Sequence, residues 1–325
     1  MSPSTIYHLP STNIPFVFFG TSPVAVGVLY ALEAEGYLPA LIVTTPDAPA
    51  GRKLTLTSPP AKLWAREHNI PLLQPAKLNP AFVQELTTSY FLLPTAPELF
   101  LVASYGLLIP RRVLDLPKHG TLNVHPSLLP KYRGPSPIQS AILNGDTETG
   151  VTIMLMNEKM DEGPMLIEER VSLTGNEVNE ELEIQLATIG GKVLAHIIPD
   201  WIAGKINPRE QDHTQATYTR KFEKSDGYIE PSLLECHSRE GGNLGPSSNL
   251  DPRCLGDDTI QEAERKVRAL GNTPGTYTIL QTKGGKEMRV KILSAKIEDE
   301  KLVPLRVIPE GKKEMSWEEF KRGSL

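Results

Sequence analysis

Short apolar runs alternate with helical patterns along the first two hundred residues. The apolar runs are continuous rather than alternating, which is typical of strands buried on both faces of a sheet. Strands are predicted at residues 16–19, 40–44, 72–73, 100–103, 121–125, 152–156 and 165–171. Helices are predicted at residues 24–34, 61–67, 81–86, 137–143 and 180–198. This βαβα rhythm predicts an α/β fold, with a doubly wound, mostly parallel, Rossmann-like sheet that carries helices on both faces.

The pattern changes after about residue 205, where the α/β rhythm stops. Residues 277–280, 290–295 and 302–307 predict strands of a small antiparallel unit. We therefore expect a larger domain over residues 1–204, a linker at 205–215 and a smaller β-rich domain over 216–325.

Residues 235–258 stand apart from both domains. The segment is rich in Gly, Ser, Pro and Asn and has almost no aliphatic pattern, and it resembles the translated product of a mobile bacterial repeat element. Too little apolar surface is available to offset the entropy of ordering, so we expect a disordered surface insert. Cys236, His237 and Cys254 lie in it, but three candidate ligands on a loop do not make a closed tetrahedral zinc site, and no metal is expected.

Charge and targeting signals narrow the class of protein. The net charge of −5 argues against a strongly basic nucleic-acid binder. The acidic excess lies in the N-terminal part, whereas residues 205–325 carry nearly balanced charge, which favours the C-terminal part for any phosphate contact. No apolar run is long enough to span a bilayer, and residues 1–10 lack the features of a signal peptide, so a cytoplasmic protein is expected.

Asn123 and His125 carry the strongest chemical signal. They are two residues apart on a predicted strand, so their side chains point to the same face, and the strand ends at once in a Pro-bounded loop. Ligands of open α/β sheets gather at such carboxyl ends. The amide can donate to a developing oxyanion, while the imidazole transfers a proton. An amide that caps a turn and a buried, satisfied histidine are the structural alternative.

The surrounding sequence makes the pair specific. Residues Asn-Val-His-Pro-Ser-Leu-Leu-Pro, from Asn123 to Pro130, resemble the signature of the folate-dependent formyltransferase family. Further blocks are similar, in the same order, to the members that act on initiator tRNA: residues 19–26, 47–52, 103–110, 131–139, 150–154, 160–165 and 216–221. The resemblance runs from about residue 14 to residue 315, apart from the insert at 235–258.

The resemblance implies a reaction and a catalytic trio. Asn123, His125 and Asp161 match the catalytic residues of the family. The implied reaction is direct attack of the free amino group of methionyl initiator tRNA on the formyl carbon of 10-formyltetrahydrofolate. It passes through a tetrahedral intermediate whose oxyanion Asn123 stabilises, and it needs neither a metal nor a covalent enzyme intermediate. Asp161 alone would be read as an ordinary turn residue.

Folate contacts are implied next to the trio. Ser127, Leu128, Leu129 and Pro130 resemble the folate-binding segment of the family, and Gly106 would let the backbone approach the ligand. The structural alternatives are a Pro-stiffened connection and an ordinary turn glycine.

Four basic residues are candidates for tRNA contact: Arg52, Lys53, Lys131 and Arg133. The loop with Arg52 continues Leu54-Thr55-Leu56-Thr57, where members of the family carry more basic residues. The C-terminal part resembles an OB-like β-barrel, a form often used for irregular nucleic acid. There Lys286, Arg289 and Lys291 could line one face. The partners implied are initiator methionyl-tRNA and the folate co-substrate, and a monomer is expected.

Other functions fit the sequence less well. A dinucleotide-dependent dehydrogenase would need a Gly-x-Gly-x-x-Gly turn, and Gly20-Thr21-Ser22-Pro23 has one glycine. The sister enzyme that acts on glycinamide ribonucleotide should have a Gly-rich phosphate loop near its start and no C-terminal domain. An amino-sugar formyltransferase is the nearer rival, because its catalytic half can look alike. A non-catalytic tRNA-binding or folate-sensing protein would not need the trio.

Overall fold

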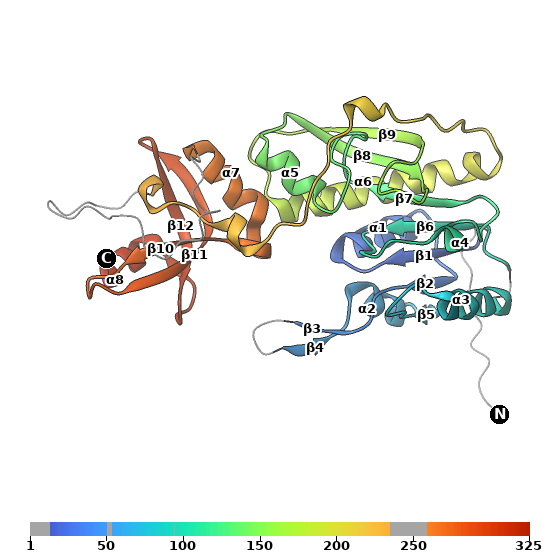
Figure 1. Ribbon diagram of the computed structural model, residues 1–325, viewed down its shortest axis with the longest axis horizontal. Helices are drawn as coiled ribbons and strands as arrows, with labels where there is room; N and C mark the ends of the chain where they lie inside the picture. Colours follow the sequence, from blue (N-terminus) through green and yellow to red (C-terminus); the bar gives the residue numbers. More distant parts are fainter. Residues whose placement is uncertain (1–13, 51–53, 94, 235–258) are drawn as a thin grey trace. The chain divides into compact units, whose positions relative to one another are not determined.

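The computed structural model describes residues 14–50, 54–93, 95–234 and 259–325 (Figure 1). The chain divides into two compact units. The first comprises residues 1–137, 149–171 and 183–219, and the second comprises 138–148, 172–182 and 220–325. Residues 205–215, expected as a linker, thus belong to the first unit. The insert at 235–258, expected to be disordered, lies outside the described residues.

A seven-stranded sheet in the order β5-β2-β1-β6-β7-β8-β9 forms the centre of the first unit. Its strands are β1 (Phe16–Gly20), β2 (Leu41–Val43), β5 (Leu72–Leu73), β6 (Leu99–Ala103), β7 (Thr121–His125), β8 (Glu148–Leu155) and β9 (Met165–Ser172). The strands from β5 to β7 pair in parallel, and β7 pairs with β8 antiparallel. The predicted α/β fold with a mostly parallel sheet is confirmed. After β1 the chain adds β2 and β5 on one side of the sheet, and after β6 it adds β7 on the other side. The strand order therefore reverses between β1 and β6.

Helices cover both faces of this sheet. They are α1 (Pro23–Ala34), α2 (Pro60–Glu67), α3 (Pro80–Leu92), α4 (Arg111–Leu114) and α6 (Asn179–Ile202). Helix α6 packs tightly because two glycines face its neighbours. A Cβ on Gly190 would overlap the side chain of Val124 in β7, and one on Gly191 would lie 2.7 Å from the carbonyl oxygen of Val28 in α1. Close backbone approach therefore holds α6 against the sheet and against α1.

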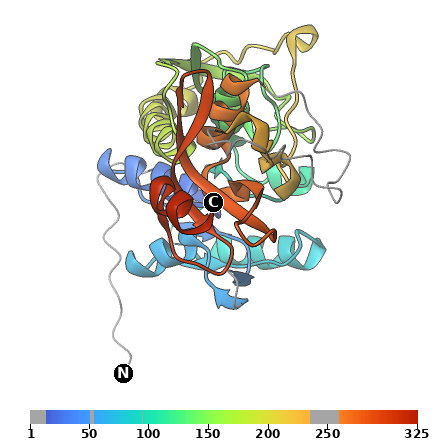
Figure 2. The ribbon, with the colours of Figure 1, turned by 90° about the vertical axis from the view of Figure 1, so that its left-hand side faces the viewer.

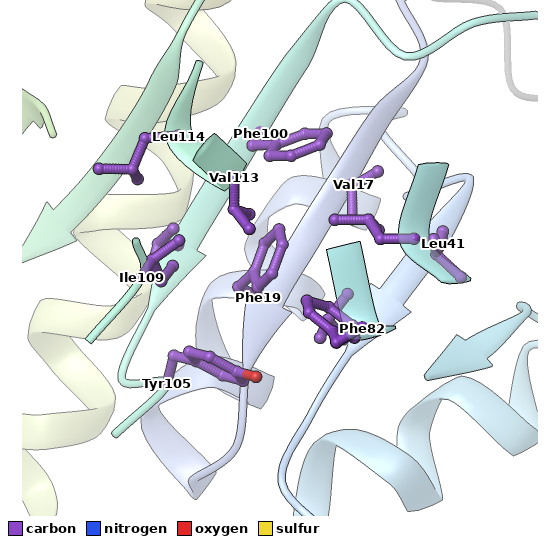
Figure 3. Packing of buried hydrophobic residues seen from close by; sticks show 12 residues of the cluster. Val17, Phe19, Leu41, Phe82, Phe100, Tyr105, Ile109, Val113 and Leu114 are labelled. Carbon is purple, nitrogen blue, oxygen red and sulfur yellow. The ribbon is translucent and has the colours of Figure 1, made fainter. Parts of the chain in front are cut away.

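The other face of the sheet carries a cluster of twelve buried residues (Figure 3). Val17 and Phe19 of β1 point to this face, since alternate strand residues share a side. Helix α3 contributes Phe82. The loop after β6 contributes Tyr105, whose ring meets Phe19 edge-on at a centroid distance of 5.4 Å. Burial raises the pKa of the Tyr105 hydroxyl. The core thus anchors the loop that leaves the carboxyl end of β6.

A small hairpin of β3 (Ala48–Ala50) and β4 (Thr55–Thr57) projects from the first unit. Asp47 anchors its base: one carboxylate oxygen accepts from Lys62 Nζ at 2.6 Å and from Gln74 Nε2 at 3.1 Å, and the other accepts from Ser58 Oγ at 3.1 Å. These hydrogen bonds, with Lys62 foremost, lower the pKa of Asp47 to about 2.

The second unit contains an antiparallel sheet in the order β10-β11-β12-β13. Its elements are α5 (Pro137–Leu143), η2 (Lys224–Gly227), η3 (Pro231–Leu233), α7 (Ile260–Leu270), η5 (Gly271–Gly275), β10 (Thr276–Gln281), β11 (Glu287–Glu298), β12 (Lys301–Pro309), β13 (Met315–Ser316) and α8 (Trp317–Ser324). In Figure 2 the long strands, in orange and red, face the viewer, with the C-terminus at α8. Trp317 and Phe320 of α8 stack at 5.4 Å within its core. The β-rich C-terminal part predicted from the sequence is confirmed.

Candidate active site

The carboxyl ends of β1 and β6 lie together where strand order reverses. The backbone N–H of Thr21 donates to the carbonyl oxygen of Ser104 at 3.2 Å, and the Thr21 hydroxyl donates to the backbone carbonyl oxygen of Tyr105 at 2.9 Å. Strand β7 is the next neighbour of β6 and ends at His125. Such a switch point is the usual ligand site of an open α/β sheet.

Asn123 and His125 lie on one face of β7, as predicted, and both are buried. Asn123 is 8% exposed and His125 is 4% exposed. Within the described residues, no group forms a hydrogen bond with the Asn123 side chain. An amide has two donor hydrogens and an acceptor oxygen, so one left unpaired near a ligand site is available to a substrate.

His125 is held by the loop that follows its strand. Its Nε2 lies 3.0 Å from the carbonyl oxygen of Tyr132. A carbonyl only accepts, so Nε2 carries the proton in the neutral ring and Nδ1 is the free acceptor. Nδ1 lies 3.8 Å from Oδ1 of Asp161. This gap exceeds a hydrogen bond and is short enough for strong attraction once the ring is protonated.

Asp161 sits in a tight turn between β8 and β9. Its φ of 52° is in the left-handed region, which is uncommon for a residue with a side chain. Carboxylate oxygen Oδ2 accepts from the backbone N–H of Gly134 at 2.8 Å, which leaves Oδ1 facing His125. The structure therefore brings together Asp161 and His125, which are far apart in sequence.

Internal hydrogen bonds hold the loop at residues 127–130 in place. The Ser127 hydroxyl donates to the carbonyl oxygen of Lys131 at 2.6 Å, and Thr152 Oγ1 bridges the Ser127 carbonyl and the Leu129 N–H. Leu129 is buried against Met154 and Met165. Leu128 and Pro130 are half-buried. The side chains of Ser127 and Leu129 therefore shape the loop from inside.

Gly106 lies in open space beyond β6. It is exposed, its φ is 85°, and no other group lies within 4 Å of the position a Cβ would take. The backbone is therefore accessible to a ligand at this point.

The burial of Arg133 contradicts its predicted role as a tRNA contact, because its side chain is 1% exposed. Nε and Nη2 donate to Gln211 Oε1, Nη1 donates to the Tyr218 hydroxyl at 2.9 Å, and Nη2 lies 2.8 Å from His213 Nδ1. A guanidinium with its donors engaged inside the protein cannot reach a phosphate. Arg133 instead holds the segment at 205–219 on the loop after β7.

Of the three other basic residues predicted to contact tRNA beside the site, only Lys131 lies within the described residues. Lys131 is exposed, and its Nζ lies 4.9 Å from the centre of the Tyr132 ring. Arg52 and Lys53 lie outside the described residues. So do Cys236, His237 and Cys254. Within the described ranges, no cluster of three or more potential ligand side chains is arranged to hold a metal ion.

A cavity of about 330 Å³ opens beside the Asp161 turn. It is lined by Arg111, Leu114, Asp115, Met156, Asn157, Glu158, Lys159, Glu162, Glu210 and His213. None of these residues is predicted from the sequence to be a site residue. Their only signal was position: Met156–Lys159 directly precede Met160-Asp161, and Arg111 follows the loop that begins at Ser104. A cavity of this size suits part of a small organic ligand.

Comparisons with known proteins show the family to which the chain belongs. The family model described as "Formyl transferase" matches residues 12–198. A methionyl-tRNA formyltransferase of Bacillus subtilis is 36% identical over 316 residues, covering 95% of this chain and 94% of that protein. The chain belongs to the methionyl-tRNA formyltransferase family. A relative of the same name from Chloroflexus aurantiacus is 45% identical over 218 residues, or 67% of this chain and 68% of its own length.

Solved structures share the family's fold. A methionyl-tRNA formyltransferase from Clostridium thermocellum aligns with a TM-score of 0.50 at 13% identity, covering 93% of this chain and 99% of that one. A sugar N-formyltransferase from a Shewanella species aligns with a TM-score of 0.57 at 15% identity, covering 88% and 99%. Both likenesses concern the fold alone. Within the described residues, no helix has the length and apolar character needed to cross a membrane.

Proposed function

We propose that the chain transfers the formyl group of 10-formyltetrahydrofolate to the amino group of methionyl initiator tRNA. The observation that carries the proposal is the unpaired amide of Asn123, on the same face of β7 as His125, with Asp161 opposite the imidazole. The near full-length match to a methionyl-tRNA formyltransferase supports this acceptor over an amino sugar.

The catalytic roles follow from which atoms are free. Attack of the amine on the formyl carbon forms a C–N bond and puts negative charge on the formyl oxygen. The Asn123 amide donates to that oxyanion, and a preorganised donor of this kind contributes about 10²–10³ in kcat. The free Nδ1 of His125 accepts the proton that the amine loses, and the Asp161 carboxylate, 3.8 Å away, stabilises the imidazolium. The proton then passes to the folate nitrogen as its bond to the formyl carbon breaks.

The folate is proposed to enter the cavity beside the Asp161 turn. The cavity combines the apolar side chains of Leu114 and Met156 with polar groups from Asn157 and Glu158, a mixture that suits a flat heterocycle with donor and acceptor edges. Exposed Gly106, in the loop after β6, and the half-buried Leu128 and Pro130, in the loop after β7, would contact the folate. Ser127 and Leu129 would support the loop after β7 from inside.

The tRNA contacts are proposed at Lys131 and at Arg52 and Lys53. In the second unit, Arg289 lies over the ring of Tyr277 at 3.6 Å, and Lys286 is exposed nearby in sequence. With Lys291, two residues beyond Arg289 on the same strand, these cations would meet phosphates of the acceptor arm. We propose that the protein acts as a cytoplasmic monomer.

The test compares formyl transfer by the wild type, Asn123→Ala and Asn176→Ala, a matched control at an exposed loop position. Methionyl initiator tRNA and a nucleotide-linked amino sugar serve as alternative acceptors. We expect transfer to the tRNA, a loss of about 10²–10³ in kcat for Asn123→Ala with folate binding retained, and no change for the control. Transfer only to the amino sugar would refute the acceptor, and an active Asn123→Ala would refute the oxyanion role.

A further inference from the structure

Gln211 is a buried amide in a segment whose neighbours are open to solvent. It is 4% exposed, whereas Asp212 and His213 beside it are exposed. The segment is fixed on both sides of the site. Arg209 exchanges two backbone hydrogen bonds with Met165 at 2.8 Å, and Thr217 donates through its N–H to the carbonyl oxygen of Pro130 at 3.2 Å. Gln211 therefore lies on a fixed backbone between the Asp161 turn and the loop after β7.

The Gln211 amide uses all its hydrogen-bonding capacity. Nε2 donates to the carbonyl oxygen of Asp161 at 2.8 Å and to that of Gly163 at 2.7 Å. Oε1 accepts from Arg133 Nη2 at 2.7 Å and from Nε at 3.1 Å. The amide cannot be turned over, because carbonyls only accept and a guanidinium only donates. Arg133 therefore fixes the direction in which Gln211 donates.

The turn that Gln211 holds has little room to move elsewhere. Asp161 has a φ of 52°. Gly163 lies so close to Leu155 that an added Cβ would overlap the Leu155 carbonyl oxygen. The two carbonyls bonded by Gln211 flank Glu162, so they define the path of the backbone immediately after the Asp161 side chain. Any release of this clamp would change where the Asp161 carboxylate points.

We propose that Gln211 is a positioning residue for Asp161, and that Arg133 orients it. The inference rests on the proposed function, in which Asp161 stabilises the protonated His125. The separation of 3.8 Å between Oδ1 and Nδ1 leaves no direct hydrogen bond to hold the carboxylate on that side. Its position depends instead on Gly134 and on the clamped backbone. A displacement of about 1 Å at a reacting group costs on the order of 10²-fold in rate.

Gln211→Glu is the discriminating variant because it is nearly isosteric. The carboxylate still accepts from Arg133, so the segment stays attached, but both donors to the turn are lost and an oxygen faces two carbonyl oxygens. Gln215→Glu makes the same change at an exposed position of the same segment and serves as the control. Both are assayed in the wild-type and the Asp161→Asn background, under single-turnover conditions, with thermal unfolding followed alongside.

We expect Gln211→Glu to lower kcat by about 10- to 100-fold, with KM for both substrates within about threefold of the control. In the Asp161→Asn background the added loss should be less than about threefold, because both changes act through one group. Histidine nitrogen NMR should show a changed His125 signal, and this readout requires no turnover.

Two results would overturn the inference. One is a kcat within about twofold of the Gln215→Glu control together with an unchanged His125 signal. The other is an equal loss in both backgrounds, which would mean that Gln211 acts on the fold and not through Asp161. Absence of formyl transfer by the wild type would count against the proposed function instead, and the His125 signal would still decide the role of Gln211.

Discussion

Replacing Arg133 by leucine should lower the free energy of unfolding of the first unit. Replacing an exposed residue that contacts tRNA should leave this free energy unchanged. The change removes the donors to Gln211, Tyr218 and His213 and the charge 3.5 Å from Glu162. Of the three partners only Gln211 is buried, and leaving its amide oxygen without a donor costs about 1–3 kcal/mol. For a unit of this size, that corresponds to a fall in Tm of roughly 5 °C.

Thermal unfolding by circular dichroism measures this change, with Arg66→Leu as the matched control. Arg66 is exposed on α2, so its replacement should alter stability by no more than about 0.5 kcal/mol. tRNA binding at two salt concentrations tests the alternative role. A normal Tm together with weaker binding and a smaller salt dependence would refute the buried clamp and restore Arg133 as a phosphate contact.

Two further predictions concern the turn and the hairpin. Gly163→Ala should destabilise the protein by about 1–3 kcal/mol, because the added Cβ would overlap Leu155. Gly323→Ala in α8 is the control, and it should be neutral or slightly stabilising because its Cβ would meet nothing within 4 Å. Equal urea midpoints for the two variants would contradict the packing around Gly163. Asp47 has a pKa lowered to about 2 in the folded state from an ordinary 3.8, so its stabilising contribution is present above pH 4 and is lost as the pH falls towards 2. The difference in urea midpoint between wild type and Asp47→Asn should therefore shrink below pH 4, and a difference that grows on acidification would show the sign to be wrong.

The strands of the parallel sheet were predictable because burial on both faces leaves a continuous apolar run, as in Phe16–Phe19. The C-terminal helices were missed although each begins with a capping signal. Thr259 with Glu262 precedes α7, and Ser316 with Glu319 precedes α8, and each pair forms a capping box. Both capping boxes can be recognised in the sequence, but they lie in the C-terminal part, where only the strand patterns were used to predict structure.

The burial of Arg133 could not be predicted in the same way. Its partner Gln211 is 78 positions away, and Tyr218 is 85 positions away. A basic residue beside a catalytic loop has the same local pattern whether it faces solvent or a distant segment. The cavity residues share this problem, since Arg111, Glu158 and Glu210 meet only in the folded chain. Sequence motifs predict the candidate catalytic residues, whereas the side chains that hold those residues in place are brought to them by long-range contacts.

The contact between Arg133 and Gln211 also sets an order of events during synthesis. The ribosome releases residues 205–219 only after the strands of the sheet and the whole of α6. At about 5–20 residues per second, the 78 positions between the two partners take roughly 4–16 s to translate. Over that interval the nascent sheet can form while the Asp161 turn still lacks its clamp. If Gln211 positions Asp161 as proposed, the Asp161 turn is completed only after the sheet, by one of the last segments of the first unit to leave the exit tunnel.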